Sequence, residues 1–255
     1  MSRPARRTRA VILAAGRGTR LGSATADLPK VMVVLAGRTL LAHQRSTLRA
    51  ARIDDIHLVL GHGAAAVRVD PDAQGLTIWE NPAYATTNMV ATLLCADGLL
   101  DGSADLVIAY GDIVYTSDVV AALLAVDAPV SVVVDLAWRD YWQARMADPL
   151  ADAETLRMDA DGRLTELGRR PDEYDDVQGQ YTGMIRVRAD ATLRFRASAT
   201  ALVGEDPRAY MTTLLQRLID DGVHVQAAPV HNGWLEIDQP ADLEIDHARF
   251  WSSVD

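Results

Sequence analysis

The segment with the clearest chemical character reads LAAGRGTRLGSATADLPK, where three glycines and two arginines precede a lysine that follows a proline. Gly16 and Gly18 would let backbone N–H groups approach phosphate oxygens closely. Arg20 and Lys30 would bring positive charge to the same loop. Because the loop follows an apolar run typical of a buried strand, we expect it to bind a strongly anionic group at the end of that strand.

The spacing of this loop differs from two common phosphate-binding motifs. A dinucleotide fingerprint needs G-x-G-x-x-G at the opening of a helix, but here the third glycine, Gly22, comes one position late. A P-loop needs Gly-Lys-Ser/Thr, whereas Gly22 is followed by Ser23. A third interpretation is a loop that follows the first strand and wraps a nucleoside triphosphate.

Two aspartates further along the chain follow predicted strands. Asp112 comes after Asp105–Tyr110, and Asp238 comes after Trp234–Ile237. An open parallel sheet binds ligands at the carboxyl ends of its strands, so we expect both carboxylates at the same edge as Gly16. Two carboxylates and a triphosphate suit Mg²⁺, which prefers oxygen ligands and keeps several waters. Alternatively, each aspartate could cap the helical pattern that begins soon after it.

The segment from about 137 to 185 combines aromatic and acidic residues, a composition that suits a cationic head group. A quaternary ammonium prefers an aromatic cage, whereas a primary ammonium has three N–H donors and prefers carboxylates. The acidic run from Asp148 to Glu154 favours a primary amine, although the aromatics could instead pack this segment onto the sheet. The candidate acceptor contacts are Trp138, Tyr141, Asp152, Glu154, Tyr181 and Glu236, and Arg169, Arg170 and Arg186 could hold a phosphonate.

The scaffold for these residues is predicted by the apolar pattern. Strand-like runs alternate with helical patterns in the first half of the chain. This alternation predicts an α/β fold with a mostly parallel, Rossmann-like sheet and helices on both faces. The predicted strands are Ala10–Ala15, Ile56–Leu60, Leu76–Trp79, Asp105–Tyr110 and Val130–Asp135, and the predicted helices are Thr39–Ala51, Asn88–Leu99 and Ser117–Val126.

The middle of the chain changes to an antiparallel pattern. Asp161-Gly162 is a strong hairpin signal between the flanking segments Glu154–Asp159 and Arg163–Gly168. With a further strand at Gln178–Val187, residues 137–185 are interpreted as a β insertion that covers the acceptor site, within a single domain spanning 1–255. Helix and strand patterns then resume at Arg208–Asp221, Val223–Ala228, Trp234–Ile237 and Ala241–Trp251.

Composition narrows the class of function. The net charge of −10 over 255 residues argues against a nucleic-acid partner, which would need clustered lysines and arginines. No apolar run is long enough for a membrane helix. The single cysteine, Cys95, allows no intrachain disulfide, so we expect a cytoplasmic protein, monomeric or homodimeric. The basic residues 1–8 are expected to form a frayed arm.

The loop sequence LAAGRGTRLG…LPK resembles the signature of nucleotidyltransferases that join a nucleoside monophosphate to a phosphorylated small molecule. The segments NPAY with Asn88, Gly111-Asp112 and WLEID are similar to the same superfamily, especially its phosphocholine and aminoalkylphosphonate cytidylyltransferases. The resemblance implies CTP as substrate and Mg²⁺ held by Asp112 and Asp238. Lys30 and Arg20 would be catalytic, and the expected nucleotide contacts are Ala14, Ala15, Gly16, Gly18, Thr19, Gly61 and Asn88.

The expected reaction is attack of an acceptor oxyanion on the α-phosphorus of the nucleotide, with pyrophosphate leaving. A phosphate or phosphonate is already ionised near neutral pH, so no general base is required, and catalysis rests on positioning and charge neutralisation. The favoured acceptor is 2-aminoethylphosphonate. The alternatives are phosphocholine, a sugar 1-phosphate, or a catalytically silent nucleotide-binding module, the last disfavoured because Lys30, Asp112 and Asp238 are all present.

Overall fold

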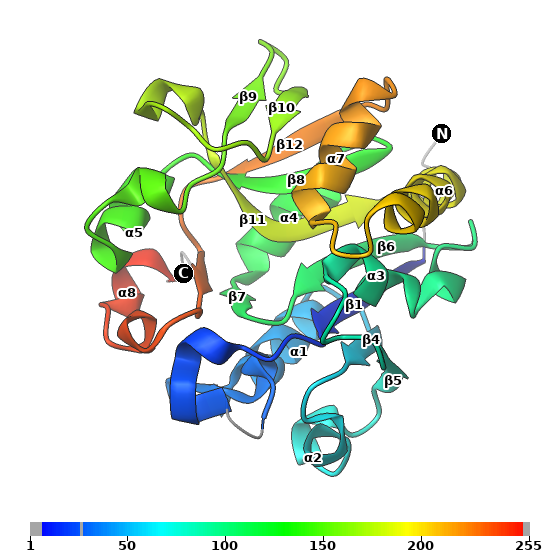
Figure 1. The fold of residues 1–255 in the computed structure, drawn as a ribbon, viewed down its shortest axis with the longest axis vertical. Coiled ribbons are helices and arrows are strands. Elements are labelled where there is room, and N and C mark those ends of the chain that lie inside the picture. The colour runs from blue at the N-terminus through cyan, green and yellow to red at the C-terminus, as the bar shows by residue number, and fades with distance from the viewer. Residues whose placement is uncertain (1–6, 26–27, 252–255) are drawn as a thin grey trace.

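The computed structural model describes residues 7–25 and 28–251 and contains a central sheet of seven strands (Figure 1). Six strands run parallel, and β11 runs antiparallel to both of its neighbours, β6 and β8. The mostly parallel α/β sheet predicted from the sequence is confirmed. In spatial order the strands are β12 (Val225–Val230), β8 (Val130–Asp135), β11 (Gln180–Val187), β6 (Asp105–Tyr110), β1 (Thr8–Ala14), β4 (Asp55–Leu60) and β5 (Thr77–Glu80).

The two faces of the sheet bury separate apolar cores because neighbouring side chains on a strand point to opposite faces. In β1, Ile12 belongs to one core, and Val11 and Leu13 belong to the other. Helices α1 (Leu40–Ala50), α4 (Ser117–Ala125) and α5 (Trp138–Arg145) contribute to the first core, together with the short α2 (Ala64–Arg68) and α8 (His247–Phe250). Helices α3 (Met89–Leu94), α6 (Ala189–Glu205) and α7 (Met211–Asp220) contribute to the second.

The segment predicted as an insertion contains a hairpin and a helix. The hairpin pairs β9 (Leu156–Met158) with β10 (Leu164–Leu167) in antiparallel order. Its turn contains Gly162 at φ 77°, in the left-handed region that glycine tolerates. The backbone N–H of Ala227 in β12 donates to the Gly162 carbonyl over 3.0 Å, which holds the hairpin against the edge of the main sheet. The strand predicted at Gln178–Val187 is β11, which lies inside the main sheet.

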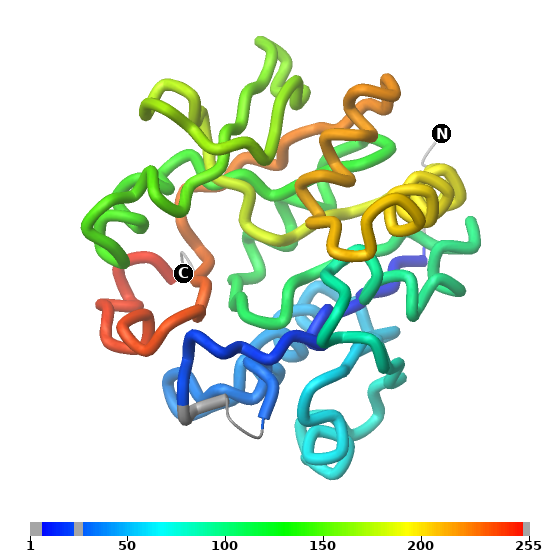
Figure 2. The backbone as a smooth tube through the Cα atoms, viewed as in Figure 1, coloured from blue at the N-terminus to red at the C-terminus, as the bar shows by residue number. Residues whose placement is uncertain are grey.

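The C-terminal part of the chain returns to the centre through β13 (Trp234–Glu236), which pairs antiparallel with β7 (Ile113–Tyr115). The helix predicted over Ala241–Trp251 is instead two short pieces, the 3₁₀ turn η7 (Pro240–Leu243) and α8. Figure 2 shows this C-terminal segment passing close to the loop that follows β1. The remaining short elements are η1 (Thr19–Thr25), η2 (Lys30–Met32), β2 (Val34–Leu35), β3 (Arg38–Thr39), η3 (Pro71–Ala73), η4 (Asp97–Leu99), η5 (Pro149–Ala151) and η6 (Tyr174–Asp176).

The frayed arm predicted over residues 1–8 lies mostly outside the described residues. Thr8, however, already belongs to β1. Among the helices that the structure describes, none has the length and apolar character needed to cross a membrane.

Candidate active site

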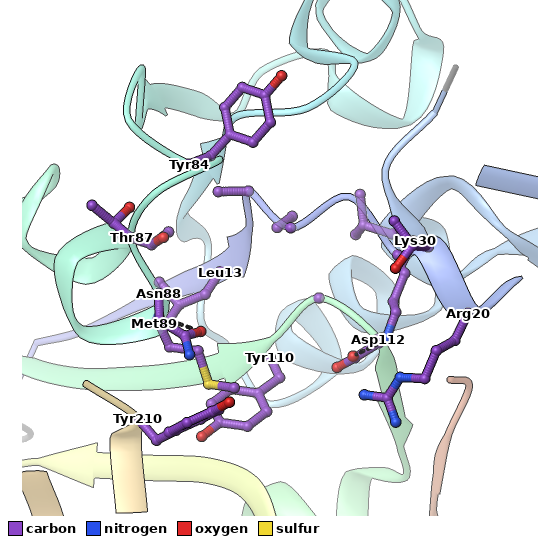
Figure 3. A pocket seen from close by; sticks show the side chains of 18 residues that line it. Leu13, Arg20, Lys30, Tyr84, Thr87, Asn88, Met89, Tyr110, Asp112 and Tyr210 are labelled. Atoms are coloured by element: carbon purple, nitrogen blue, oxygen red, sulfur yellow. Dashed lines mark hydrogen bonds and ion pairs between the residues drawn. The ribbon is translucent and has the colours of Figure 1, made fainter. Parts of the chain in front are cut away.

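A cavity of about 340 Å³ lies where the carboxyl ends of β1 and β6 meet (Figure 3). Arg20, Lys30 and Asp112 form a charged end, and Tyr84 and Met89 lie at the other end (Figure 3). The structure brings nine of the predicted site residues to this cavity: Ala14, Ala15, Gly16, Gly18, Thr19, Arg20, Lys30, Asn88 and Asp112.

Two glycines allow the walls of the cavity to form. Gly18 adopts φ 62° at the point where the loop turns into η1. A Cβ on Gly111 would lie 2.8 Å from the carbonyl oxygen of Leu13. That oxygen already accepts a 2.9 Å hydrogen bond from the Gly111 N–H. The absence of a side chain at Gly111 therefore lets the end of β6 approach β1 closely. It also brings Asp112 beside the loop after β1 that carries Gly16, Gly18 and Arg20, which we call the phosphate-type loop.

Lys30 is the electrostatic centre of the charged end. Its Nζ donates to Asp112 Oδ2 over 2.9 Å and also to Asp238 Oδ1. Arg20 forms an ion pair with the other oxygen of Asp238. Burial alone would lower the pKa of the Lys30 ammonium, but the two carboxylates outweigh burial and raise it. Lys30 is therefore a permanent cation although its side chain is only 17% exposed.

The two aspartates meet because of the pairing between β7 and β13. Asp112 directly precedes β7, and Asp238 follows β13. The register places Glu236 opposite Ile113, and the Ile237 N–H donates to the Asp112 carbonyl over 2.8 Å. The alternative that Asp112 caps α4 receives no support, since the N-cap residue of that helix is Thr116.

The predicted nucleotide contacts Asn88 and Gly61 have structural roles. Asn88 caps α3: its Oδ1 accepts from the Met89 N–H over 2.9 Å, and its Nδ2 donates to the Arg208 carbonyl over 3.3 Å. These bonds use one N–H and one lone pair of the amide, and the residue also lines the cavity. Gly61 does not line the cavity; a Cβ there would lie 2.7 Å from both the Ala15 carbonyl oxygen and the Tyr84 Cβ.

Two of the predicted acceptor contacts are buried in the core. Trp138 is 3% exposed and Tyr141 0%, and both belong to an aromatic cluster. The Tyr141 ring lies 5.5 Å from Trp234 and 5.1 Å from Phe250, measured between centroids. Helix α5 packs the Tyr141 side chain against Trp234 in β13 and Phe250 in α8, which buries its apolar area. The interpretation that these aromatics pack the segment onto the sheet therefore replaces direct contact with an acceptor.

None of the other acceptor candidates, Asp152, Glu154, Tyr181 and Glu236, is among the residues that line the cavity. Glu154 is partly buried and receives a 3.3 Å hydrogen bond from the Thr212 hydroxyl. Burial raises the pKa of Glu154, the Thr212 bond opposes the rise, and the neighbouring Asp152, itself exposed, adds to it. Tyr181 packs edge-on against Tyr110 with ring centroids 5.9 Å apart. Because Tyr110 lines the cavity, Tyr181 and Glu154 belong to its surroundings.

Glu236 and Arg186 are both held by ion pairs. Glu236 binds the buried Arg145 over 2.6 Å; its pKa is raised to about 7 by burial, with Arg145 opposing and the charges of Asp112 and Asp238 adding to the rise. Arg186 donates to Asp105 over 2.5 Å at the opposite edge of the sheet, so a role for Arg186 in holding a phosphonate is wrong. The exposed Arg169 and Arg170 are not among the residues that line the cavity.

Several cavity residues were not among the predicted contacts. They are Leu13, Val31, Tyr84, Thr87, Met89, Thr92, Tyr110, Gly111 and Tyr210. Tyr110 and Gly111 end the strand that precedes Asp112, so their position after an apolar run was a usable signal. Tyr210 comes from the start of α7, far along the chain, and no local pattern in the sequence indicates that it reaches this site.

The donor set of the charged end fits a divalent cation such as Mg²⁺. No group of three or more His, Cys, Asp or Glu side chains with metal-binding geometry occurs among the described residues. Asp112 and Asp238, however, converge on the same Lys30 nitrogen and supply two hard oxygen ligands. Mg²⁺ commonly binds through one or two carboxylates together with substrate phosphates and water. A pair of carboxylates beside a phosphate-type loop is therefore sufficient protein ligation.

Comparisons with known sequences agree with this geometry. Residues 10–174 match the family described as the MobA-like NTP transferase domain. CTP:phosphoglutamine cytidylyltransferase of Campylobacter jejuni is 33% identical over 252 residues, covering 92% of this chain and 98% of the relative. CMP-5'-(3-aminopropyl)phosphonate synthase of Streptomyces rubellomurinus is 30% identical over 255 residues, covering 95% of this chain and 38% of that longer relative.

Solved structures share the fold. The CTP:phosphocholine cytidylyltransferase of Streptococcus pneumoniae has a TM-score of 0.71 at 18% identity, covering 93% of this chain and 96% of the other. The inositol-1-phosphate CTP transferase of T. maritima has a TM-score of 0.72 at 22% identity, covering 94% and 93%. At these identities the likeness establishes the α/β architecture with its small antiparallel sheets.

Proposed function

The chain belongs to the MobA-like NTP transferase domain family and is a nucleotidyltransferase, and we propose that it transfers CMP from CTP to a small phosphonate or phosphoester that carries an amine. The observation that carries the proposal is the position of Lys30. Its ammonium is held between Asp112 and Asp238 at the charged end of a cavity large enough for part of a nucleotide. Such an arrangement neutralises phosphate charge, which is the main requirement of phosphoryl-type transfer.

The reaction needs positioning more than proton transfer. A phosphonate oxygen of the acceptor forms a bond to the α-phosphorus of CTP while the bond from that phosphorus to the bridging oxygen breaks. Pyrophosphate leaves with the electron pair. Lys30 stabilises the charge that develops around the α-phosphorus, and Arg20 stabilises the departing pyrophosphate. Asp112 and Asp238 would hold Mg²⁺, which supplies further charge neutralisation when bound.

The preference for CTP is supported by the two sequence relatives, whose names contain CTP and CMP. Within the cavity, the Asn88 amide uses one N–H in its bond to Arg208 and one lone pair in its bond from Met89, which leaves a second N–H and a second lone pair for a base edge. Recognition of the base is therefore assigned to Asn88 together with backbone groups of Ala14, Ala15 and Gly16, which also line the cavity. A Cβ on Gly16 would meet no atom within 4 Å, so its backbone is open to a ligand.

The proposed acceptor carries N–H groups, and 2-aminoethylphosphonate is favoured. Glu154 is a partly buried carboxylate beside Tyr110 and Tyr181, close enough to influence the ionisation of both hydroxyls. An ammonium with N–H donors can hydrogen-bond to such a carboxylate, whereas a quaternary ammonium cannot. Trp138 and Tyr141 are buried in the core and therefore cannot supply the aromatic cage that a quaternary ammonium would prefer.

Unused hydrogen-bond acceptors lie at the same end of the sheet. Gln180 and Thr182, on either side of Tyr181 in β11, each bury a side-chain oxygen that has no partner within the part of the chain that the structure describes. Unpaired buried oxygens cost free energy unless a ligand or water satisfies them. Because side chains alternate along a strand, both oxygens lie on the face of the sheet opposite to Tyr181, so the class of acceptor rests on Glu154 and on the relatives. The nitrogen-bearing compounds in the names of the two sequence relatives support the same class.

The test is a pyrophosphate-release assay that crosses four nucleoside triphosphates with a panel of acceptors. The panel contains 2-aminoethylphosphonate, 3-aminopropylphosphonate, phosphoglutamine, phosphocholine and glucose 1-phosphate. We expect CTP to be the preferred nucleotide and an acceptor with N–H groups to exceed phosphocholine. A higher rate with phosphocholine would reject the carboxylate argument, and a higher rate with glucose 1-phosphate would reject the amine-bearing class. Release with UTP, GTP or ATP alone would reject the cytidylyl assignment.

A further inference from the structure

A buried arginine outside the cavity is bonded to the segment that delivers Asp238. Arg145, the last residue of α5, has a side chain that is 2% exposed. Its Nε and Nη2 donate to the two carboxylate oxygens of Asp242 over 3.0 and 3.2 Å, and its Nη1 donates to Glu236 over 2.6 Å. A planar guanidinium suits this fork of bonds, which a lysine ammonium cannot reproduce.

Asp242 transmits this contact to the backbone of Asp238. The Asp242 side chain is fully buried, and its Oδ2 accepts hydrogen bonds from the backbone N–H groups of Asp238 and Gln239 over 2.8 and 2.9 Å. A single carboxylate therefore joins Arg145 to the main chain of the residue whose own carboxylate contacts Lys30 and Arg20. The backbone of Asp238 is fixed from outside the cavity while its side chain acts inside it.

Helix α5 holds the same segment at a second point. The Tyr141 hydroxyl donates to the Glu236 carbonyl over 3.1 Å and accepts from the Glu236 N–H over 2.8 Å. The guanidinium of Arg145 lies 5.3 Å from the centroid of the Tyr141 ring, which adds a cation–π contact. Helix α5 thus bonds the main chain of Glu236 directly through Tyr141, and it reaches the main chain of Asp238 through Arg145 and the Asp242 carboxylate.

We propose that Arg145 and Asp242 are positioning residues that hold Asp238 in the orientation in which it binds a divalent cation. The inference rests on the proposed function, since it assigns Asp238 to that cation. It gives α5 a positioning role in place of the predicted contact with the acceptor, because the helix orients one end of the charged cluster. Partners that orient metal ligands in this way typically affect metal affinity by roughly 10–100-fold when they are replaced.

A matched arginine elsewhere in the chain provides the control. Arg186 also makes an ion pair with a buried aspartate, Asp105, and its guanidinium donates in addition to the backbone carbonyls of Leu124 and Val126. The Arg186–Asp105 pair lies at the opposite edge of the sheet, so Arg186→Lys disturbs a part-buried arginine–aspartate pair without touching Asp238. A general loss of stability should appear in both variants, whereas a loss of metal affinity should appear in only one.

The experiment measures Mn²⁺ binding by electron paramagnetic resonance of free Mn²⁺, using the full chain and the variants Arg145→Lys, Arg145→Gln, Asp242→Asn, Arg186→Lys and Asp238→Asn. Thermal unfolding of each variant is measured in parallel. The Mg²⁺ concentration for half-maximal pyrophosphate release and the KM for CTP at saturating Mg²⁺ give a second readout. We expect Arg145→Lys to raise the Kd for Mn²⁺ by about tenfold, and Arg145→Gln by more. Arg186→Lys should leave the Kd for Mn²⁺ unchanged, while lowering the Tm by about as much as Arg145→Lys does.

The outcomes separate the inference from the proposed function. If Asp238→Asn does not weaken Mn²⁺ binding, the metal site itself is misassigned and the proposed function loses its metal ligand. If Asp238→Asn weakens binding but Arg145→Lys and Asp242→Asn bind Mn²⁺ as the unchanged chain does, the positioning role is wrong. Equal loss of affinity in Arg186→Lys and Arg145→Lys would show a general effect of destabilisation and would also overturn the inference. If Asp242→Asn is too unstable to purify, the comparison of the Arg145 and Arg186 variants decides alone.

Discussion

The Nζ of Lys30 lies 2.9 Å from the Oδ2 of Asp112, although 82 residues separate them in the chain. The contact joins the loop after β1 to the end of β6, the two strands whose carboxyl ends border the cavity. Asp238 completes the cluster from a third direction. The charge at the centre of the site therefore depends on three segments that lie far apart in the sequence.

Replacing Lys30 should slow the chemical step. Lys30→Ala removes the preorganised cation that we propose to lie next to the α-phosphate, and loss of one such donor typically lowers turnover by about 10²–10³-fold. We expect kcat to fall by that amount while the KM for CTP changes less, as measured by steady-state pyrophosphate release. The variant Arg17→Ala is the control, because Arg17 belongs to the same loop but is not among the residues that line the cavity. Near-normal turnover of Lys30→Ala would remove Lys30 from the mechanism.

The two aspartates should be needed for metal-dependent activity but not for folding. Asp112→Asn and Asp238→Asn keep the size of each side chain and remove its charge, so Mg²⁺-dependent pyrophosphate release should fall to background. The far-ultraviolet circular dichroism should match that of the unchanged chain. A variant that unfolds, yet retains specific activity in its folded fraction, would assign that aspartate a structural role.

Glu154 should control the affinity for the amine. Glu154→Gln removes a charged hydrogen bond worth about 1.5–3 kcal/mol, so the KM for an amine-bearing acceptor should rise by roughly ten- to hundredfold. The KM for CTP should change little. Asp152→Asn is the matched control: Asp152 is exposed, two residues away, so its effect should be smaller. An equal effect of both variants would point to a general field of negative charge.

The same carboxylate should make acceptor binding depend on pH. Burial raises the pKa of Glu154 above its usual 4.5, so the group takes up a proton at a higher pH than an exposed glutamate does. The protonated form attracts an ammonium less, and the KM for the amine should therefore increase as pH falls through the raised pKa. The titratable groups that interact electrostatically with Glu154 are Asp152, Tyr110 and Tyr181. Glu154→Gln should lose this dependence while retaining any that comes from ionisation of the phosphonate.

Gly111 should tolerate no side chain. A Cβ at Gly111 would lie 2.8 Å from the Leu13 carbonyl oxygen, so Gly111→Ala must push β6 and β1 apart at the cavity. Overpacking of this kind typically costs about 1–3 kcal/mol of stability. We expect a lower free energy of unfolding in urea and a higher KM for CTP. Gly98→Ala is the control, since a Cβ there meets no atom within 4 Å. Equal stability of the two variants would contradict the close approach.

The central part of the fold was predictable from the sequence because it rests on local patterns. Runs such as Val130–Asp135, with valine at four of six positions, are typical of parallel strands covered on both faces. Helix α6 was not predicted, although its buried residues Thr192, Phe195, Ala199 and Leu202 follow helical spacing. A threonine and an alanine in that stripe weaken the apolar signal.

The residues of the site were less predictable where they depend on distant contacts. The phosphate-type loop and Asp112 could be recognised from their own neighbours in the sequence. The burial of Trp138 and Tyr141 could not, because it depends on Trp234 and Phe250, about 100 residues further along the chain. The bond between Arg145 and Asp242 spans 97 residues and has no local signature.

The long sequence separation of Lys30 and Asp238 determines how much of the chain must be synthesised before the charged cluster can form. The two residues are 208 positions apart, so the ribosome must add most of the chain before they can meet. Strands β1, β4, β5 and β6 come from the first 110 residues, and neighbouring segments can pair at low entropic cost. Asp238 is added only after β13, well over 100 positions after the last of these strands. A nascent chain interrupted before this point would carry the loop with Lys30 but not the second carboxylate, so the charged cluster cannot form until Asp238 has been added.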